Sequence, residues 1–101
     1  NQLLDLAKLE SGSLVPAVTY HDAIGQVRTL TESFAELAGR RQVQLVFDAQ
    51  PDAFSGWFDA DMLEKVGYNL LSNALKFSPE GGTVHVAARV ANEQLHLTVA
   101  D

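Results

Sequence analysis

The chain has 101 residues, of which 47% are hydrophobic and 20% charged, and its formal net charge is −6. These values fit one small folded domain and exclude a disordered chain. Seven Lys and Arg against thirteen Asp and Glu exclude the basic surface that binds nucleic acid. The absence of cysteine excludes disulfides, thiolate metal sites and thiol nucleophiles, and no apolar run approaches the roughly 20 residues of a membrane-spanning helix.

The first ten residues, NQLLDLAKLE, predict a helix. Leu3, Leu6 and Ala7 recur at three- and four-residue steps, and Gly12 in the following Ser-Gly-Ser can end the helix in a left-handed cap. This helix is either a fraying end or the stump of a helical bundle. Because the chain starts inside this pattern without Met and ends inside a strand-like run, we interpret it as a piece of a longer protein.

The next part of the chain predicts a strand, a long helix and a second strand. Residues 14–20 are strand-like, and Pro16 confines that strand to a sheet edge or to a strand start. Residues 23–39 carry an apolar stripe at helical spacing. Residues 42–48 alternate between apolar and polar, which is typical of a half-buried strand. Trp57-Phe58 then forms a short apolar patch before the next helix.

Residues 61–82 predict a helix with two different faces, followed by a loop. Asp61 is the expected N-cap, and Glu64 three residues later completes a capping-box-like pair. Asn69, Asn73 and Lys76 recur at steps of four and three, so they share one polar face. The opposite face is an apolar stripe of Leu63, Val66, Gly67, Leu70, Leu71 and Ala74. Ser-Pro-Glu-Gly-Gly then follows the helix and favours a loop.

Residues 83–90 and 95–101 alternate and are separated by about four turn residues, which predicts a β-hairpin. If Val90 pairs with Leu95, Arg89 faces His96 across the strands. The order strand, helix, strand, helix, hairpin predicts an α/β two-layer sandwich, in which helices pack on one face of a mixed sheet. A doubly wound nucleotide-binding fold is less favoured because no glycine fingerprint follows the first strand.

The polar column of the central helix, Asn69, Asn73 and Lys76, suits a phosphate and its metal ion. Mg²⁺ prefers oxygen ligands and keeps several waters, so one carboxamide oxygen together with phosphate oxygens is a common arrangement. Lysine supplies a point charge to a phosphate. From the residues alone, however, an ordinary solvated helix face explains such a column more often than a site does. The loop-forming residues after the helix favour a cover over a ligand.

The run NLLSNALKFSPEGG at residues 69–82 closely resembles the N box of the sensor histidine kinases of two-component systems. That box opens the ATP site of their catalytic domain, within the wider gyrase–Hsp90–histidine kinase–MutL group. Residues 3–12 resemble the end of the second helix of the family's dimerisation and phosphoacceptor domain. Residues 14–47 match its first strand, long helix and second strand, and residues 97–101 resemble the approach to its first glycine box. Only the N box is a specific motif.

The resemblance implies the Bergerat-type ATP-binding fold, incomplete at the C-terminus. Residues 1–13 would be the end of the dimerisation helix and linker, and residues 14–101 the N-terminal part of the catalytic domain. The intact protein, a protein histidine kinase, would bind Mg-ATP, transfer the γ-phosphoryl group to a histidine and pass it to a response regulator receiver domain. It would form a homodimer through its dimerisation helices. The domain would be cytoplasmic, and an inner-membrane anchor is one option for the parent.

Residue by residue, the resemblance implies a nucleotide site. Asn73 would bind Mg²⁺ through its carboxamide oxygen, and Asn69 would line the phosphate and metal region. Lys76 would contact a phosphate, and Phe77 would border the nucleotide. Asp101 would accept a hydrogen bond from the adenine amino group. Hydrolytic relatives have a glutamate general base at the position of Asn69; a carboxamide cannot accept that proton, so phosphoryl transfer is expected rather than efficient hydrolysis.

Two other interpretations of the sequence stay open. The chain could belong to a kinase-like binding module, such as an anti-sigma or scaffold protein, without histidine kinase activity, or to a small α/β domain with no ligand. His21 is disfavoured as a phosphoacceptor because it follows a strand, and His85 and His96 fall on the polar face of the hairpin. Since the glycine boxes would lie beyond Asp101, we expect the 101-residue piece to be inactive and to bind nucleotide weakly or not at all.

Overall fold

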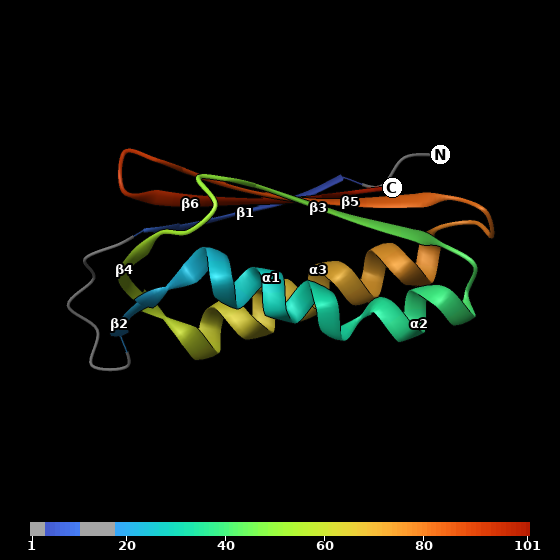
Figure 1. The fold of residues 1–101 in the computed structure, drawn as a ribbon, viewed down its shortest axis with the longest axis horizontal. Helices are drawn as coiled ribbons and strands as arrows, with labels where there is room; N and C mark the ends of the chain where they lie inside the picture. The colour runs from blue at the N-terminus through green and yellow to red at the C-terminus, as the bar shows by residue number, and fades with distance from the viewer. Residues whose placement is uncertain (1–3, 11–17) are drawn as a thin grey trace.

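A β-sheet forms one layer of the molecule, and helices cover one of its faces (Figure 1). The computed structural model describes residues 4–10 and 18–101. The strands are β1 Leu4–Glu10, β2 Val18–Asp22, β3 Gln44–Gln50, β4 Ser55–Asp59, β5 Thr83–Ala91 and β6 Gln94–Ala100, and the helices are α1 Ala23–Ser33, α2 Ala35–Arg40 and α3 Ala60–Phe77. The predicted two-layer α/β sandwich with a mixed sheet is confirmed. Within the described residues no helix is both long enough and apolar enough to cross a membrane.

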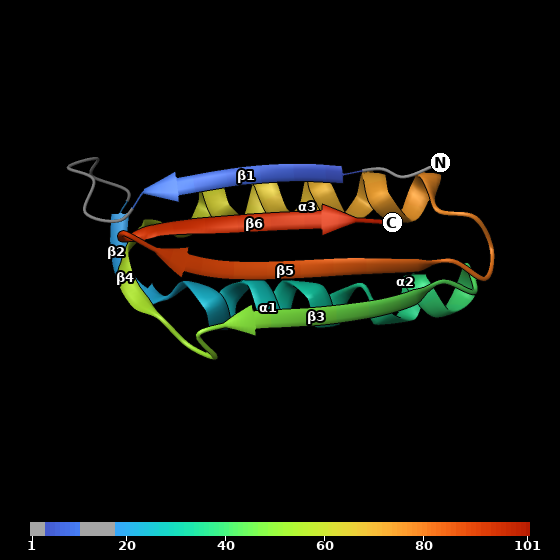
Figure 2. The ribbon, with the colours of Figure 1, turned by 90° about the horizontal axis from the view of Figure 1, so that it is seen from above.

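The main sheet has the strand order β1-β6-β5-β3, with β3 parallel to β5 and the other pairs antiparallel (Figure 2). In the predicted hairpin, Val90 pairs with Leu95 and Arg89 with His96, as expected. The connection is tighter than the predicted four residues, because β5 ends at Ala91 and β6 begins at Gln94, which leaves only Asn92 and Glu93 in the turn. These two residues have φ angles of 53° and 59°, and two left-handed residues in a row match the right-handed twist of a hairpin.

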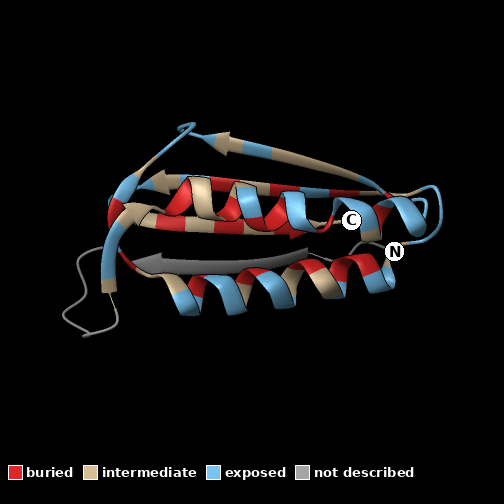
Figure 3. Ribbon diagram, turned by 60° about the horizontal axis from the view of Figure 1, so that its bottom comes forward, coloured by how far each residue is buried: buried red, intermediate tan, exposed pale blue. Residues whose placement is uncertain are grey.

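The core lies between the sheet and the helices, and the alternation of the strands selects which side chains enter it. The inward residues of β5 and β6 are buried: Val84, Val86, Ala88, Leu95, Leu97 and Val99. They meet the apolar stripes of the helices, which Figure 3 shows as buried faces turned towards the sheet. Where α1 crosses α3, a Cβ atom at Gly67 would lie 2.5 Å from Leu30 Cδ2, so glycine permits this close approach of the two helices.

The helix predicted over residues 23–39 is divided into α1 and α2 at Phe34. The hydroxyl groups of Thr31 and Ser33 donate to the carbonyl oxygens of Val27 and Leu30, at 2.8 Å for Thr31. Such bonds compete with the backbone ladder. Phe34 has φ −92° and ψ −1°, and its buried ring packs 5.2 Å from the ring of Tyr68 on α3. Local polar bonding and tertiary packing together break a helix that periodicity predicts as continuous.

A second, two-stranded ribbon pairs β2 with β4, and β4 is the strand that the sequence prediction missed. Its alternation is one of burial rather than of residue type, because Gly56 and Phe58 are buried while Trp57 is half exposed. Tyr20 pairs with Trp57, and their rings meet edge to face at 5.3 Å. The strand predicted over residues 14–20 is confirmed from Val18 onward, and residues 14–17 lie outside the described residues.

The helix predicted over the first ten residues is wrong where the structure describes them, because Leu4–Glu10 is strand β1. It pairs antiparallel with β6, from Leu4 opposite Ala100 to Glu10 opposite Gln94. Without this partner, β6 would present a row of unpaired amide and carbonyl groups at the sheet edge. Seven paired residues satisfy that edge, which outweighs the weak helix propensity of a short segment. The assignment of residues 1–13 to a dimerisation helix and linker stays a prediction.

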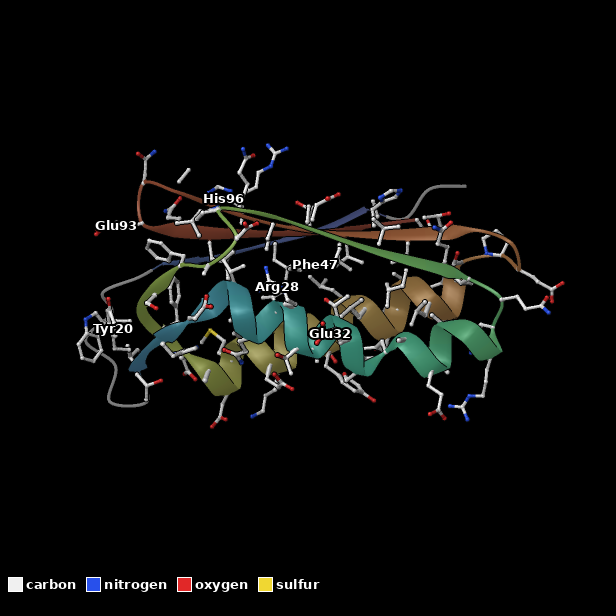
Figure 4. The ribbon with its side chains drawn as sticks, in the orientation of Figure 1. Tyr20, Arg28, Glu32, Phe47, Glu93 and His96 are labelled. Carbon is white, nitrogen blue, oxygen red and sulfur yellow. The ribbon has the colours of Figure 1, made fainter. Side chains whose placement is uncertain are left out.

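The loop between β3 and β4 is tied to the start of α1. The carboxylate of Asp22 caps α1 by accepting from the amide of Gly25 at 2.9 Å, and it also accepts from the amide of Phe54 at 2.9 Å. Partial burial alone would raise the pKa of Asp22, but these amide hydrogen bonds and the charge of Arg28 outweigh it and lower the pKa below 3.8. Arg28 donates to the carbonyl of Asp52 at 2.8 Å and lies over the Phe47 ring (Figure 4).

Candidate functional site

The central helix α3 begins two residues earlier than expected, with Asp59 rather than Asp61 as its N-cap. Asp59 is extended, with φ −80° and ψ 102°, and its carboxylate accepts from the amide of Met62 at 3.0 Å. Asp59 ends β4 and already has the extended backbone that an N-cap needs. Asp61 instead lies in the first turn, where its charge favours the helix dipole. The predicted pairing of Asp61 with Glu64 is therefore wrong.

The first turns of α3 are fastened to α1 and β2 by side chains. Gln26 of α1 donates to the carbonyl of Ala60 at 2.8 Å and to the carboxylate of Glu64 at 3.3 Å. His21 of β2 donates through Nε2 to the side-chain oxygen of Gln26 at 2.7 Å. One turn further along, Tyr68 packs on Phe34. Glu64 and Tyr68 therefore mark the flank of α3 that faces α1.

The predicted polar column lies on the side of α3 turned away from the sheet. Asn69, Asn73 and Lys76 are all exposed. Figure 3 shows that the outer face of α3 consists mainly of exposed residues. Because a helix turns by about 100° per residue, the directions of Asn69 and Asn73 differ by about 40°, and Asn73 points about 140° away from Tyr68. Asn73 is thus directed away from α1, whereas Asn69 and Lys76 lie about 100° and 80° from Tyr68, and all three are open to solvent. The structure confirms that the three side chains share an exposed face, which both a ligand site and a solvated surface require.

The last turn of α3 brings two of the predicted site residues together. The ammonium of Lys76 lies 5.4 Å from the centre of the Phe77 ring, within the range of a cation–π interaction. Phe77 is 62% exposed and is not part of the hydrophobic core. The helix ends at Ser78, whose amide donates to the carbonyl of Ala74 at 3.0 Å. An exposed cation and an exposed ring therefore stand side by side.

Asp101 follows β6, which runs back over the helix layer and contacts α3. Figures 1 and 2 both show the C-terminal end of the chain above the C-terminal half of α3. Asp101 is half buried. The fold therefore brings its backbone to the same end of the molecule as Asn73, Lys76 and Phe77, although about 25 residues of hairpin separate them in the chain.

Two hollows of the described surface lie on the other face of the sheet, away from α3. One is lined by residues of β3, the following loop and β5, including Asp48, Gln50 and Arg89. Its neighbour is lined by β5 and β6, including Arg89, His96 and Thr98. Both arise because small residues such as Ala87 leave space on the uncovered sheet face. The sequence prediction assigned them no role.

The donor groups near the column suit one kind of metal. Among the described residues, no three His, Asp or Glu side chains gather into a metal cluster. The column offers neutral carboxamide oxygens and a lysine cation. Such a donor set fits Mg²⁺ that takes most of its ligands from phosphate oxygens and water, and it does not fit a metal held by protein ligands alone.

The sequence has curated relatives that are histidine kinases. Histidine kinase P4 of Formosa agariphila is 27% identical over 101 residues, all of this chain and 7% of that protein. The sensor histidine kinase TmoS of Ectopseudomonas mendocina is 31% identical over 83% of this chain and 8% of its own length. The cell-division control histidine kinase PdhS of Brucella abortus is 36% identical over 86% of this chain and 8% of its own length. No protein-family model matches the chain.

Solved structures share the fold. The catalytic domain of histidine kinase ThkA superposes with a TM-score of 0.75 at 17% identity, over 81% of this chain and 56% of that one. The cytoplasmic segment of histidine kinase QseC superposes with a TM-score of 0.67 at 13% identity, over 90% of this chain and 82% of that one. The two-layer sandwich is therefore a fold of the histidine kinase catalytic type.

Sequence and fold point to the same group of proteins. The chain is similar in sequence to histidine kinases over 83% to 100% of its length, and it shares the fold of a histidine kinase catalytic domain. It spans only 7 to 8% of the length of these curated relatives.

Proposed function

We propose that this chain forms one wall of a Mg-ATP site in a protein histidine kinase of a two-component system. The observation that carries the proposal is the exposed column of Asn69, Asn73 and Lys76 on α3, with its last turn at the same end of the molecule as Asp101. The names of the relatives support the kinase activity. The column is directed to solvent, which leaves room for a bound nucleotide.

Each residue of the column has a separate role in the proposal. Asn73 provides a carboxamide oxygen to Mg²⁺, and Asn69, about one turn earlier, lines the phosphate and metal region. Lys76 neutralises phosphate charge as a point cation. Phe77 borders the nucleotide with its exposed ring, and Asp101 accepts from the adenine amino group. Bound Mg²⁺ supplies neutralisation of the phosphate charge that develops during transfer.

The chemistry of Asn69 decides between transfer and hydrolysis. A neutral carboxamide accepts and donates hydrogen bonds, but it does not take up a proton from water at neutral pH. The column therefore holds and orients the phosphates and leaves the nucleophile to another group, which we propose is a histidine of the same dimeric kinase. Such a site works by positioning and charge neutralisation. A response regulator would then receive the phosphoryl group.

The test is an Asn73→Ala variant in the full-length protein. Because the side chain is exposed and makes none of the core contacts, the far-ultraviolet circular dichroism spectrum should not change. Affinity for Mg-ATP and the rate of autophosphorylation should fall on the order of 100-fold or more. Gln44→Ala is the matched control, since Gln44 is also an exposed carboxamide but lies on β3.

Two outcomes would contradict the proposal. Normal autophosphorylation by the Asn73→Ala variant would remove the metal role of Asn73. Binding of Mg-ATP by the wild-type protein without formation of phosphohistidine would instead identify a kinase-like binding module.

A further inference from the structure

The turn between α2 and β3 holds the far end of the α3 helix. Arg41 in this turn donates through Nη1 to the carbonyl of Leu75 at 3.2 Å, and the same nitrogen lies 3.5 Å from the carbonyl of Lys76. These carbonyls belong to the last turn of α3, where no further helical amide is available to them. The cation of Arg41 also stands at the negative end of the helix dipole. Arg41 thus acts as a C-cap supplied from 34 residues away in the chain.

The neighbouring residue, Gln42, holds the loop that follows α3. Its backbone is left-handed, with φ 56°, and its carbonyl accepts from the amide of Gly81 at 2.7 Å. With its amide nitrogen turned towards Glu80, its side chain donates to both carboxylate oxygens at 3.1 Å. The backbone amide of Gln44 also donates a hydrogen bond to the carbonyl of Gly82 at 2.9 Å. A non-glycine residue in this conformation persists only where its surroundings compensate the strain.

Arg40, the neighbour of Arg41, makes a different contact. Its guanidinium pairs with Glu36 one turn earlier on α2, at 3.8 Å, and the two side chains are 69% and 85% exposed. An exposed ion pair of this kind contributes little to stability. The chain therefore carries two adjacent arginines of the same charge, of which only Arg41 reaches the α3 helix.

We propose that Arg41, supported by Gln42, is a positioning residue for the nucleotide site. Lys76 and Phe77 are the last two residues of α3, and helix ends fray unless their carbonyls are satisfied. By bonding the carbonyls of Leu75 and Lys76, Arg41 fixes the backbone from which the Lys76 ammonium and the Phe77 ring extend. The inference rests on the proposed function and adds to it the residue that orders the last turn of the site.

The test compares Arg41→Ala with Arg40→Ala in the full-length protein. For Arg41→Ala, the KM for ATP should rise about 5- to 10-fold while kcat stays within about twofold, because an uncapped turn must be ordered again each time nucleotide binds. Arg40→Ala should leave both constants within about twofold of the wild type. Arg41→Lys keeps the charge and a donor, so it should recover most of the loss.

Hydrogen exchange supplies a readout that a general loss of stability would not reproduce. In Arg41→Ala, the backbone amides of residues 76–78 and 80–82 should exchange about 10-fold faster, while those of the β5–β6 hairpin stay unchanged. Equal KM values for the Arg41 and Arg40 variants would overturn the inference and leave the proposed function in place. A wild-type protein that binds no Mg-ATP would overturn both.

If Arg41→Ala does not fold, Arg41→Met compared with Arg40→Met carries the same test. Methionine keeps the apolar stem and removes the donors, and equal KM values for that pair would again overturn the inference.

Discussion

The two ends of α3 are built in opposite ways. At the N-terminal end, Asp59 caps the helix, and Gln26 joins its first turn to α1. At the C-terminal end, Lys76 and Phe77 are exposed and the backbone is held from outside by Arg41. The first end uses its side chains for the fold, whereas the second leaves Lys76 and Phe77 exposed. One continuous helix can therefore combine an N-terminal end held by side-chain contacts with a C-terminal end whose side chains do not pack in the core.

The largest expected effect is on stability, and it distinguishes a core residue of α3 from an exposed residue near its C-terminal end. Leu63→Ala should lower the free energy of unfolding by about 2–5 kcal/mol, because Leu63 is fully buried and its loss leaves a cavity. Phe77→Ala should cost less than about 0.5 kcal/mol, since the ring is 62% exposed, yet it should weaken nucleotide binding. Urea denaturation and nucleotide titration measure the two effects. A larger loss of stability for Phe77→Ala would refute the division between the two ends.

A smaller loss of stability is expected at Asp22, the N-cap of α1. Asp22→Ala removes the cap of α1 and the partner of the Phe54 amide, which should cost about 1–2 kcal/mol at pH 7. The lowered pKa sets the sign of the pH dependence. Because the folded pKa lies below 3.8, the contribution of the carboxylate is complete above pH 3.8 and is lost as the pH falls through the folded value.

Thermal unfolding of the wild type and of Asp22→Ala at pH 7 and at progressively lower pH measures this contribution. The two curves should converge in acid. If the difference in stability between the wild type and Asp22→Ala widened as the pH fell below 3.8, the expected direction of the pH dependence would be wrong.

The smallest effect tests which aspartate starts α3. Asp59→Ala should lower the free energy of unfolding by about 1 kcal/mol because it removes the N-cap. Asp61→Ala should cost less than about 0.5 kcal/mol, since it removes only a favourable charge from the first turn. Both variants should bind Mg-ATP as the wild type does, because the change is at the end of α3 away from Asn73. An equal cost for the two substitutions would contradict the observed cap.

Patterns of short range were sufficient to predict several features of this chain. The two faces of α3 follow from the spacing of its residues along the helix, so the amino-acid order alone identifies the exposed column of Asn69, Asn73 and Lys76. The pairing of Val90 with Leu95 follows from alternation on both sides of a turn. The N box is a contiguous motif, and its resemblance to the histidine kinases required only the order of its residues.

Tertiary structure decided what depends on partners far along the chain. The segment Leu4–Glu10 has a helical pattern but is a strand because the edge of β6 offers it backbone partners. The helix predicted over residues 23–39 breaks at Phe34 because that ring packs on Tyr68. Arg41 caps α3 across 34 residues. Periodicity describes which residues share a face, whereas these outcomes depend on hydrogen bonds and contacts between elements, which no local spacing encodes.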